Sequence, residues 1–540
     1  MTNRAGGRRA LLAVAGGGLL FAAHPPADIA WLGVLAPVPL LWLARDLARH
    51  STRPVPAGAG WGLLAGVAFF GPLLWWIIRF GVVAWVLLVA LQAAFVGVIV
   101  AGLAGWGERA GRPVAAVVWW VALEAARSSW PLGGFPWGVL GYSQHSGGVL
   151  LPVARTLGVL GVSALCVGIA VCIEAALRRG ASALRSGAGV ADRSLAATSA
   201  VAVPASAAAA LVAAGVLASG SPPAPTSRSV DAAAVQGNNL ELPPVTTRMS
   251  DARVERIVDL MVATTARLAA DPPQVTVWPE NALDADPRDD PALRRRLDEA
   301  LRLLGGRPLL VGTLLDGPRP GTFLNAIVQF GPGARIEDLY VKRRLVPFGE
   351  YVPGRRWLDW IPPLEQIPTD GIPGEGPKVF HVAGAVIGPV TCFESLFPRL
   401  VHSQIRAGAE ALVVTTNNAS FGRTPASRQH LAFSQLRAVE TGRWVLHAGI
   451  SGISAVVSPD GRVSQRSALF EQVVVRDRLP LVTGQTVATR TGDLVGTASQ
   501  VVAATGLVGL AVARRRTGGT PARRVGSGRV PAPADRAPVI

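Results

Sequence analysis

The sequence predicts a membrane-embedded helical bundle of eight spans joined to an extracytoplasmic α/β domain. Of the 540 residues, 50% are hydrophobic and only 16% are charged, a balance too apolar for an ordinary soluble globule or for a disordered chain. The apolar residues are concentrated in eight stretches, several of which approach the roughly 20 residues that a spanning helix needs. A long polar region before the last stretch alternates strand-like and helix-like segments, which is typical of an α/β domain.

The eight predicted spans form a group of seven and a single last one. They cover residues 10–24, 28–44, 58–78, 80–107, 113–126, 152–177, 195–219 and 497–513. We therefore predict a membrane domain over 1–220, a last span over 497–513 and a basic, disordered cytoplasmic tail over 514–540. The first stretch follows three arginines, as the core of a signal peptide does, but further spans come directly after it, which favours a retained helix.

The arginine clusters predict the orientation of the chain. In an eight-span arrangement the N-terminus, the loops around Arg45, Arg109 and Arg178, and the tail after Arg514 all lie on one side. Basic loops stay on the cytoplasmic side, so both termini are predicted to be cytoplasmic. The formal net charge of +17 comes from clusters beside apolar stretches rather than from one polar face, which favours a cell-membrane protein over a nucleic-acid binder.

The region 228–486 is predicted to be the extracytoplasmic α/β domain. Its expected strands cover residues 230–235, 275–277, 308–314, 326–330, 385–390, 412–416 and 445–457, and its expected helices cover 254–270 and 427–441. The strands are continuous apolar runs, as strands covered on both faces are. A linker rich in Pro and Ser precedes the domain at 221–227.

Three residues with reactive side chains follow predicted strands. Glu280 ends the run VTVWPE, Lys342 ends a second extended run, and Cys392 follows a third. Lysine occurs at only two positions in this arginine-rich chain, 342 and 378, which makes Lys342 notable. Because the sites of open α/β sheets lie at the carboxyl ends of the strands, we expect the three side chains to meet.

A glutamate, a lysine and a cysteine together can carry out acyl transfer. Cys392 is the predicted nucleophile and Glu280 the base, with burial against Trp278 raising the pKa of Glu280 towards a useful value. Lys342 is expected to stabilise the thiolate and the oxyanion, assisted by the backbone N–H of Phe393. Glu350, eight residues after Lys342, is predicted to support catalysis by orienting Lys342 or the incoming amine.

Each of these residues taken singly also has a structural explanation. Glu280 could cap a helix, Lys342 could belong to a basic trio, and Cys392 could be a small buried hydrophobic residue. Their conjunction favours an active site. No pair of Cys or His residues has the spacing of metal ligands, so we expect neither a metal nor a cofactor.

The residues around these positions resemble known catalytic motifs. The motifs are Trp278-Pro279-Glu280, Lys342 with Pro347-Phe348-Gly349-Glu350-Tyr351-Val352-Pro353, and Cys392-Phe393-Glu394. They resemble the three catalytic motifs of the nitrilase superfamily and, within it, those of its membrane-anchored branch, the apolipoprotein N-acyltransferase family. The likeness extends to segments 235–238, 437–443, 452–455 and 489–493, and to 134–137 and 140–144 in the membrane part.

The resemblance implies both the fold and the reaction. The domain would be a nitrilase-like αββα sandwich. A membrane phospholipid would donate an acyl chain to Cys392 as a thioester, and the α-amine of the S-diacylglyceryl-cysteine of a lipoprotein would accept it. Phe393 and Glu394 would serve the oxyanion or the substrate. Apart from the resemblance, we expect a monomer and, from the charge distribution, no nucleic-acid partner.

Other functions remain open from the residues. One alternative is a membrane-anchored amide hydrolase, in which water resolves the thioester. A second is an acyltransferase paralogue of altered specificity. A third is a transporter or scaffold, which the scarcity of ionisable residues within the spans disfavours. Departures from the family pattern bear on specificity: Phe393 replaces a tyrosine, Asn418 an aspartate and Ser420 a tryptophan, and 243–246 lacks an aromatic residue.

The segment 356–361 (RWLDWI) is predicted to form a lipid lid. Trp357, Leu358, Trp360 and Ile361 would dip into the membrane interface over the acyl chain, because tryptophan favours that depth. The alternative is ordinary packing of these side chains against the domain.

Overall fold

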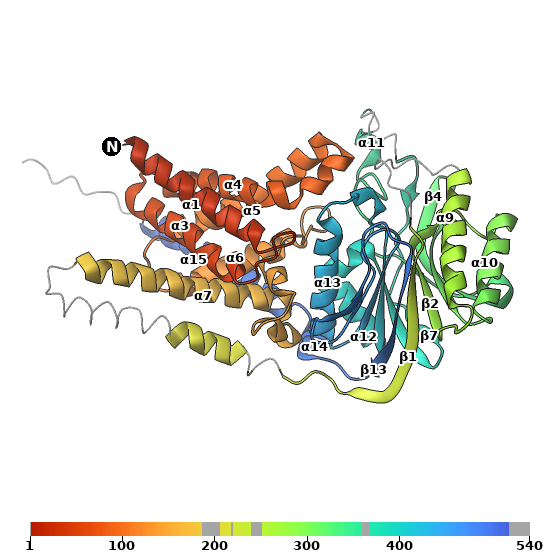
Figure 1. Cartoon of the computed structure of the whole chain (residues 1–540). Helices are drawn as coiled ribbons and strands as arrows, with labels where there is room; N and C mark the ends of the chain where they lie inside the picture. The colour runs from red at the N-terminus through yellow and green to blue at the C-terminus, as the bar shows by residue number, and fades with distance from the viewer. Residues whose placement is uncertain are drawn as a thin grey trace, which may run out of the picture.

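The computed structural model describes residues 2–185, 206–215, 217, 220–238, 251–358, 360 and 367–517. Within these residues the chain forms a bundle of apolar helices beside a two-sheet sandwich (Figure 1). Most of the predicted seventh stretch, the segment 243–246 and the tail beyond residue 517 lie outside the described residues.

The described helices of the bundle fall on the predicted apolar stretches. They are α1 (Thr2–Ala22), α2 (Leu32–Leu35), α3 (Pro37–His50), α4 (Pro54–Leu73), α5 (Val82–Trp106), α6 (Arg112–Arg127), α7 (Ala154–Arg185) and α15 (Leu494–Thr517). Among the described residues, three helical segments are long and apolar enough to cross a membrane: Pro54–Leu73, Val82–Trp106 and Leu151–Ser182. Shorter apolar helices cover Ser206–Gly215 and Leu494–Gly509.

Small residues bring α4 and α5 together. A Cβ atom added at Gly62 would lie 2.8 Å from the Cα of Gly97, and one added at Gly58 would lie 2.8 Å from the Cα of Ala101. Gly66 makes the same kind of approach to Ala93. This spacing of small residues every fourth position is how helices approach closely in an apolar environment.

The sandwich consists of two sheets. The first has the order β13-β1-β2-β3-β4-β5, with β6 beside β4, and the second has the order β12-β11-β10-β9-β8-β7. The strands are β1 (Pro225–Gln236), β2 (Val275–Leu283), β3 (Leu309–Asp316), β4 (Thr322–Gly331), β5 (Arg335–Val341), β6 (Asp370–Gly371), β7 (Phe380–Val382), β8 (Ala385–Thr391), β9 (Ala411–Thr416), β10 (Val445–Gly449), β11 (Ala455–Val457), β12 (Val463–Arg466) and β13 (Val473–Val482). The central strands β1-β2-β3 and β8-β9-β10 are parallel, as the continuous apolar runs predict.

Helices cover the outer face of each sheet. An apolar cluster joins the first sheet to α9 (Asp251–Thr265) and α10 (Pro291–Leu303), and another joins the second sheet to α12 (Pro398–Arg406) and α13 (Ala426–Thr441). A third cluster fills the space between the sheets. The layers are therefore helix, sheet, sheet, helix, as predicted.

The structure corrects some element boundaries. The predicted strand 445–457 is two antiparallel strands, β10 and β11, which pair with each other across a turn. The predicted helix 254–270 ends as an α-helix at Thr265. Sequence analysis missed β5, β12 and β13, because these strands carry exposed and half-exposed residues rather than continuous apolar runs.

Helix α13 packs directly against the bundle. The indole Nε1 of Trp137 donates to Gln429 Oε1 at 2.8 Å, and the Tyr142 hydroxyl donates to the Leu396 carbonyl at 3.1 Å. Phe393 and Leu396 belong to the same apolar cluster as the bundle helices. The sandwich therefore presents the turn after β8 to the membrane part.

Candidate active site

Cys392 lies at the carboxyl end of β8, in a strained turn. It begins the 3-10 helix Cys392–Leu396, and its φ of 48° lies in the left-handed region, which residues other than glycine rarely adopt. A nucleophile in such a strand-to-helix turn is lifted off the end of the sheet. Its side chain is half-buried.

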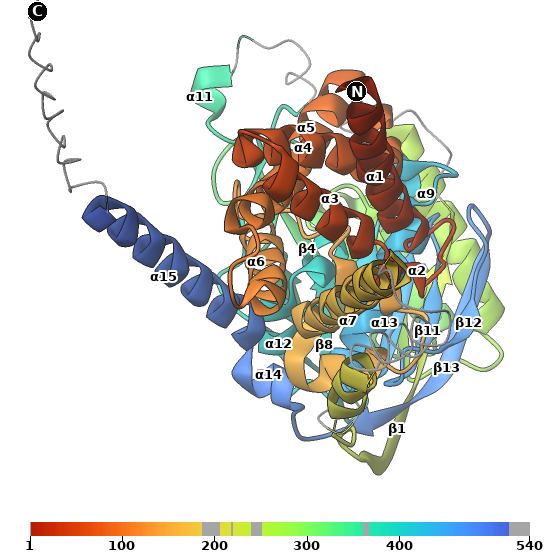
Figure 2. The ribbon, with the colours of Figure 1, turned by 90° about the vertical axis from the view of Figure 1, so that its left-hand side faces the viewer.

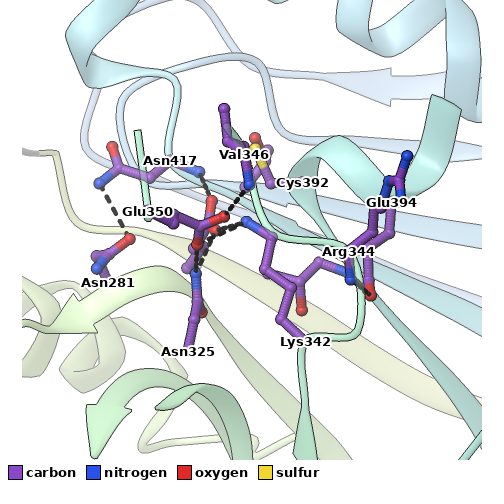
Figure 3. A network of polar contacts seen from close by, with 12 residues as sticks. Asn281, Asn325, Lys342, Arg344, Val346, Glu350, Cys392, Glu394 and Asn417 are labelled. Carbon is purple, nitrogen blue, oxygen red and sulfur yellow. Dashed lines mark hydrogen bonds and ion pairs between the residues drawn. The ribbon is translucent and has the colours of Figure 1, made fainter. Parts of the chain in front are cut away.

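Lys342 follows β5 and lies between two carboxylates. Its Nζ donates to Glu280 Oε1 at 2.9 Å and to Glu350 Oε1 at 3.0 Å, and its side chain is only 1% exposed. Glu280 belongs to β2, while Glu350 lies in the loop after Lys342. Figure 3 shows Lys342, Glu350 and Cys392 converging from separate segments of the chain.

Glu280 reaches the site where the β2 ladder is interrupted. Pairing with β3 shifts between Trp278 and Leu283, next to Pro279, which has no N–H to donate. Glu280 Oε2 accepts the backbone N–H of Asn417 at 2.8 Å, and Oε1 accepts Asn325 Nδ2 at 2.9 Å. Both carboxylate oxygens are thus held by donors.

Asn325 is a site residue that sequence analysis missed. Its Nδ2 also donates to Glu350 Oε1 at 2.6 Å, and its carbonyl oxygen accepts the Lys342 N–H at 2.8 Å. The one signal in the sequence is a polar residue near the start of an apolar strand, which is too common to indicate a site. Asn325 fixes the two carboxylates around the ammonium group.

The ion pair reverses one prediction. Burial alone would raise the pKa of Glu280, but the Lys342 ammonium and the hydrogen bonds from Asn325 and Asn417 hold it below its ordinary value. The prediction that burial against Trp278 raises this pKa is therefore wrong. The Trp278 indole instead donates to Thr265 Oγ1 on α9 at 3.0 Å.

The same charges act on Lys342 and on the thiol. Burial opposes the charge on Lys342, but the carboxylates of Glu280 and Glu350 raise its pKa well above the ordinary value. Burial and the Glu280 carboxylate raise the pKa of Cys392, and the opposing effect of the Lys342 ammonium, which lowers it, is smaller. The resting site therefore holds an ionised Lys–Glu pair beside a protonated thiol.

Comparisons with known proteins agree with this geometry. A family model for the apolipoprotein N-acyltransferase N-terminal domain matches residues 16–172, and a carbon-nitrogen hydrolase model matches 231–487. An apolipoprotein N-acyltransferase of Mycolicibacterium smegmatis is 34% identical over 90% of this chain and 82% of that protein. The chain belongs to the apolipoprotein N-acyltransferase family.

Two further matches cover different shares of the chain. An apolipoprotein N-acyltransferase of Geobacter metallireducens is 29% identical over 90% of this chain and 92% of that protein. A crystal structure of an amidase from Nesterenkonia sp. covers 46% of this chain and 90% of its own, with 21% identity and a TM-score of 0.33. The carbon-nitrogen hydrolase match, together with the two covered sheets, confirms the predicted nitrilase-like sandwich.

In this member of the family, Glu394 is committed to protein donors. Its carboxylate accepts the Tyr340 hydroxyl at 2.7 Å and the backbone N–H groups of Arg343 and Thr391 at 2.7 and 2.8 Å, and Glu394 is 1% exposed. Glu394 thus ties the loop after β5 to the Cys392 turn. This buried carboxylate is taken up by protein donors, which disagrees with the prediction that it serves the oxyanion or the substrate.

The side chain of Phe393 faces the bundle. Its ring lies 6.2 Å from that of Phe135 and 5.0 Å from that of Phe397, between ring centroids. The predicted oxyanion contribution of Phe393 concerns only its backbone N–H, and that role stays a prediction. Phe393 thus places an apolar ring at the junction of the two parts.

Helix α11 (Arg355–Leu358), which begins the predicted lid segment, stands off from the molecule (Figure 2). Trp357, in α11 (Arg355–Leu358), is 68% exposed and Trp360 is 79% exposed, whereas Leu358 is half-buried. The segment is tethered by the ion pair between Arg355 and Asp370, at 2.6 Å. The two indoles do not pack against the domain, which excludes that alternative for them; Ile361 lies outside the described residues.

One acidic cluster outside the site bears on metal binding. Among the described residues, only Asp286, Asp289 and Asp316 form a group whose carboxylates approach within 4.8 Å. Arg288 Nε contacts both oxygens of Asp286 at 3.0 Å. The arginine thus already neutralises the most buried of these carboxylates.

Proposed function

We propose that this chain transfers an acyl chain from a membrane phospholipid, through a thioester on Cys392, to the α-amine of an S-diacylglyceryl-cysteine at a lipoprotein N-terminus. The observation that carries the proposal is a half-buried thiol beside a buried Lys–Glu pair. The chain is also related over 90% of its length to an apolipoprotein N-acyltransferase. Glu280, Lys342 and Cys392 are the proposed catalytic residues, and Glu350 supports them.

In the first half-reaction Cys392 Sγ attacks the ester carbonyl of the phospholipid. The thiol proton passes to Glu280, which the Lys342 ammonium keeps ionised and therefore able to accept it. Because the thiol has a raised pKa, proton transfer accompanies formation of the carbon–sulfur bond. Lys342 and the Phe393 N–H stabilise the oxyanion. Collapse expels the lysophospholipid alkoxide, which takes the proton back from Glu280.

In the second half-reaction the lipoprotein amine attacks the thioester carbonyl. Glu280 accepts a proton from the attacking nitrogen, the carbon–sulfur bond breaks, and the thiolate leaves beside Lys342 before it regains the proton. The product is an amide, and the site returns to its starting state. Such a two-step exchange produces ping-pong kinetics.

The decisive experiment follows the acyl group. Purified protein with phospholipid alone should gain one acyl group on Cys392 by mass spectrometry, and addition of a diacylglyceryl peptide should move it to the peptide amine. Release as free fatty acid in the presence of the peptide would instead favour the amide hydrolase. Absence of any adduct on Cys392 would contradict the proposal.

The eight-span arrangement is part of the proposal. Its domains are the membrane domain 1–220, the catalytic domain 228–486 outside the cytoplasm, the last span 497–513 and the cytoplasmic tail 514–540. Support comes from the basic end of the bundle, where Arg8 and Arg9 pair with Asp46 from another helix. In Figure 1 the N-terminus lies at the end of the bundle away from the sandwich, as a cytoplasmic basic end requires.

Labelling of single cysteines tests this orientation. In a chain without its native cysteines, Arg296→Cys on α10 should react with an impermeant maleimide in intact spheroplasts. The matched variant Arg49→Cys, at the end of α3, should react only after lysis. The reverse labelling pattern would contradict the proposed membrane orientation but would not bear on the reaction proposed at Cys392.

The lid also belongs to this proposal. Trp357 and Trp360 are both exposed. Trp357 lies on the short tethered helix α11, which also presents Arg356, whose guanidinium lies 4.8 Å from the Trp357 ring centroid. Exposed tryptophans beside arginines favour the membrane–water interface. The segment 357–361 would rest there and cover the acyl chain.

A further inference from the structure

One arginine beside the candidate active site has no charged partner. Arg344 lies two residues after Lys342, and its side chain is half-buried. Within the described residues, its guanidinium donates one hydrogen bond, from Nη2 to the Leu132 carbonyl at 3.4 Å, and lies over the Phe397 ring, 4.8 Å from the centroid. Neither partner carries a charge. Because a guanidinium has five N–H donors, most of the donors of Arg344 are available to a ligand.

The two basic residues before Arg344 are committed to protein partners. Lys342 is buried between its two carboxylates. Arg343 Nη2 donates to the Leu400 carbonyl at 3.1 Å and to Ser403 Oγ at 2.8 Å. Of these three consecutive cations, Arg344 is therefore the one that can take an anion from outside the protein.

Arg344 lies next to the turn that holds Cys392. Its backbone N–H donates to Glu394 Oε1 at 3.2 Å (Figure 3), and Glu394 is two residues beyond the thiol. Phe397, whose ring lies beneath the guanidinium, directly follows the 3-10 helix that begins at Cys392. The same short segment, 392–397, therefore carries both the sulfur and the ring that supports the guanidinium.

The helical bundle supplies the other side of this position. A side chain at Gly133 would occupy the place of Arg344 Nη2, so the loop after α6 leaves room for the guanidinium. In that loop Leu132 is 49% exposed and Trp130 is 66% exposed. Exposed tryptophan at the end of a membrane helix is typical of the lipid head-group level, where an arginine packs its stem on apolar surface and keeps its charge in water.

We propose that Arg344 binds the phosphate of the acyl-donor phospholipid while the ester carbonyl of the same lipid lies at Cys392. The assignment rests on the proposed function. A guanidinium can donate two parallel N–H bonds to the oxygens of one phosphate, and it keeps its charge when partly buried. The ring of Phe397 supports the guanidinium from beneath.

A phosphate distinguishes the two lipids that the site accepts in turn. The donor phospholipid and the diacylglyceryl acceptor both carry fatty-acyl esters on a glycerol unit, but only the donor carries a phosphate. A residue that binds the phosphate therefore selects the donor for the first half-reaction. Departure of the lysophospholipid then frees Arg344 before the acceptor binds.

Ping-pong kinetics of the full-length protein in mixed micelles test this assignment. In such kinetics kcat/KM for the donor reports only the first half-reaction, and kcat/KM for the acceptor only the second. Arg344→Gln should lower kcat/KM for the phospholipid about ten-fold and leave kcat/KM for a diacylglyceryl peptide unchanged. Arg344→Lys, which keeps the charge but not the planar fork, should give a smaller loss. Equal losses for both substrates would indicate a merely structural contact and overturn the proposal.

A donor without phosphate gives the sharper comparison. Diacylglycerol carries the same acyl esters, so the unmodified chain should use it about ten-fold less well than the phospholipid, whereas Arg344→Gln should use both alike. Arg335→Gln, at the opposite end of β5, is the matched control and should keep the preference for phospholipid. Equal use of the two donors by the unmodified chain would overturn the proposal, even where Arg344→Gln does not fold.

Inorganic phosphate separates a lipid head group from a free anion. At millimolar concentration it should leave kcat/KM for the phospholipid unchanged, because only the lipid carries an ester that fixes its phosphate at Arg344. Competition with the phospholipid would assign Arg344 to the free anion and overturn the head-group site.

The outcomes for Arg344 and for the proposed function are distinct. An unchanged donor preference in Arg344→Gln, with an acyl adduct still formed on Cys392, would refute the phosphate site alone. Failure to form the adduct in the unmodified chain would refute the proposed function, whatever the effect of Arg344→Gln.

Discussion

Two regions of this molecule place one cation between two carboxylates. In the sandwich, Lys342 lies between Glu280 and Glu350. At the basic end of the helical bundle, Arg45 pairs with Glu174, at 2.8 Å from Nε to Oε1, and with Glu108. Burial and pairing alone therefore do not distinguish a catalytic cluster from a structural one.

The chemistry of the cation makes the difference. Arg45 uses separate nitrogens of a planar fork for its two partners, Nε for Glu174 and Nη1 for Glu108. The pair with Glu174 joins helices α3 and α7. The Lys342 ammonium is a compact charge that acts on both carboxylates and on the Cys392 thiol at once. The lysine at position 342 of this arginine-rich chain is thus explained by a need for a charge that is shared.

Of the changes that test this comparison, removing the thiol should have the largest effect on activity. Cys392→Ala should lower N-acylation of a diacylglyceryl peptide by on the order of 1,000-fold or more, because no other nucleophile replaces the sulfur. Cys172→Ala, in α7, is the matched control and should keep wild-type activity. Substantial activity in folded Cys392→Ala protein would mean that the buried lysine cluster is structural too.

Exchanging the two cations should give the next largest effect. Lys342→Arg should reduce acyl transfer by about 100-fold, because a planar fork pairs with the carboxylates and no longer presents a shared charge to sulfur. Arg45→Lys should leave turnover within a few-fold but lower the melting temperature, since a buried pair is weakened. Both quantities are measured on both variants; equal losses of activity would erase the distinction between the clusters.

Removing one charge at the active cluster should separate thiol reactivity from turnover. The Glu350 carboxylate helps to raise the pKa of Cys392, so Glu350→Gln should lower that pKa and speed iodoacetamide alkylation severalfold near neutral pH. Acyl transfer should fall about ten-fold, because Lys342 loses an orienting partner. Alkylation that slows together with transfer would contradict the assigned sign.

Changes at the exposed tryptophans should be the smallest. Trp357→Ala/Trp360→Ala should raise KM for phospholipid severalfold with little change in kcat, because these residues lie outside both charged clusters. Comparison with the parent chain should also show loss of a vesicle-induced blue shift in tryptophan fluorescence. An unchanged KM together with an unchanged fluorescence spectrum would contradict the proposal that this segment is a lid.

Most residues of the candidate site could be predicted from the sequence. Glu280 and Cys392 lie at the ends of visible apolar runs and Lys342 ends an extended run, and the structure brings Glu280 and Lys342 into direct contact beside Cys392. Asn325 could not be predicted as a site residue, because polar residues near the start of a strand are common and only its hydrogen bonds to Glu280 and Glu350 give it a role.

The apolar helices, the order of the main strands and the reactive residues could all be predicted from the amino-acid sequence, since apolar runs and strand periodicity are local features. The tertiary structure decided the sign of the Glu280 pKa shift, the commitment of Glu394 to protein donors and the exposure of Trp357. These properties depend on partners from distant segments. The field at a side chain varies with the distance to each of those charges, and no local pattern contains that distance.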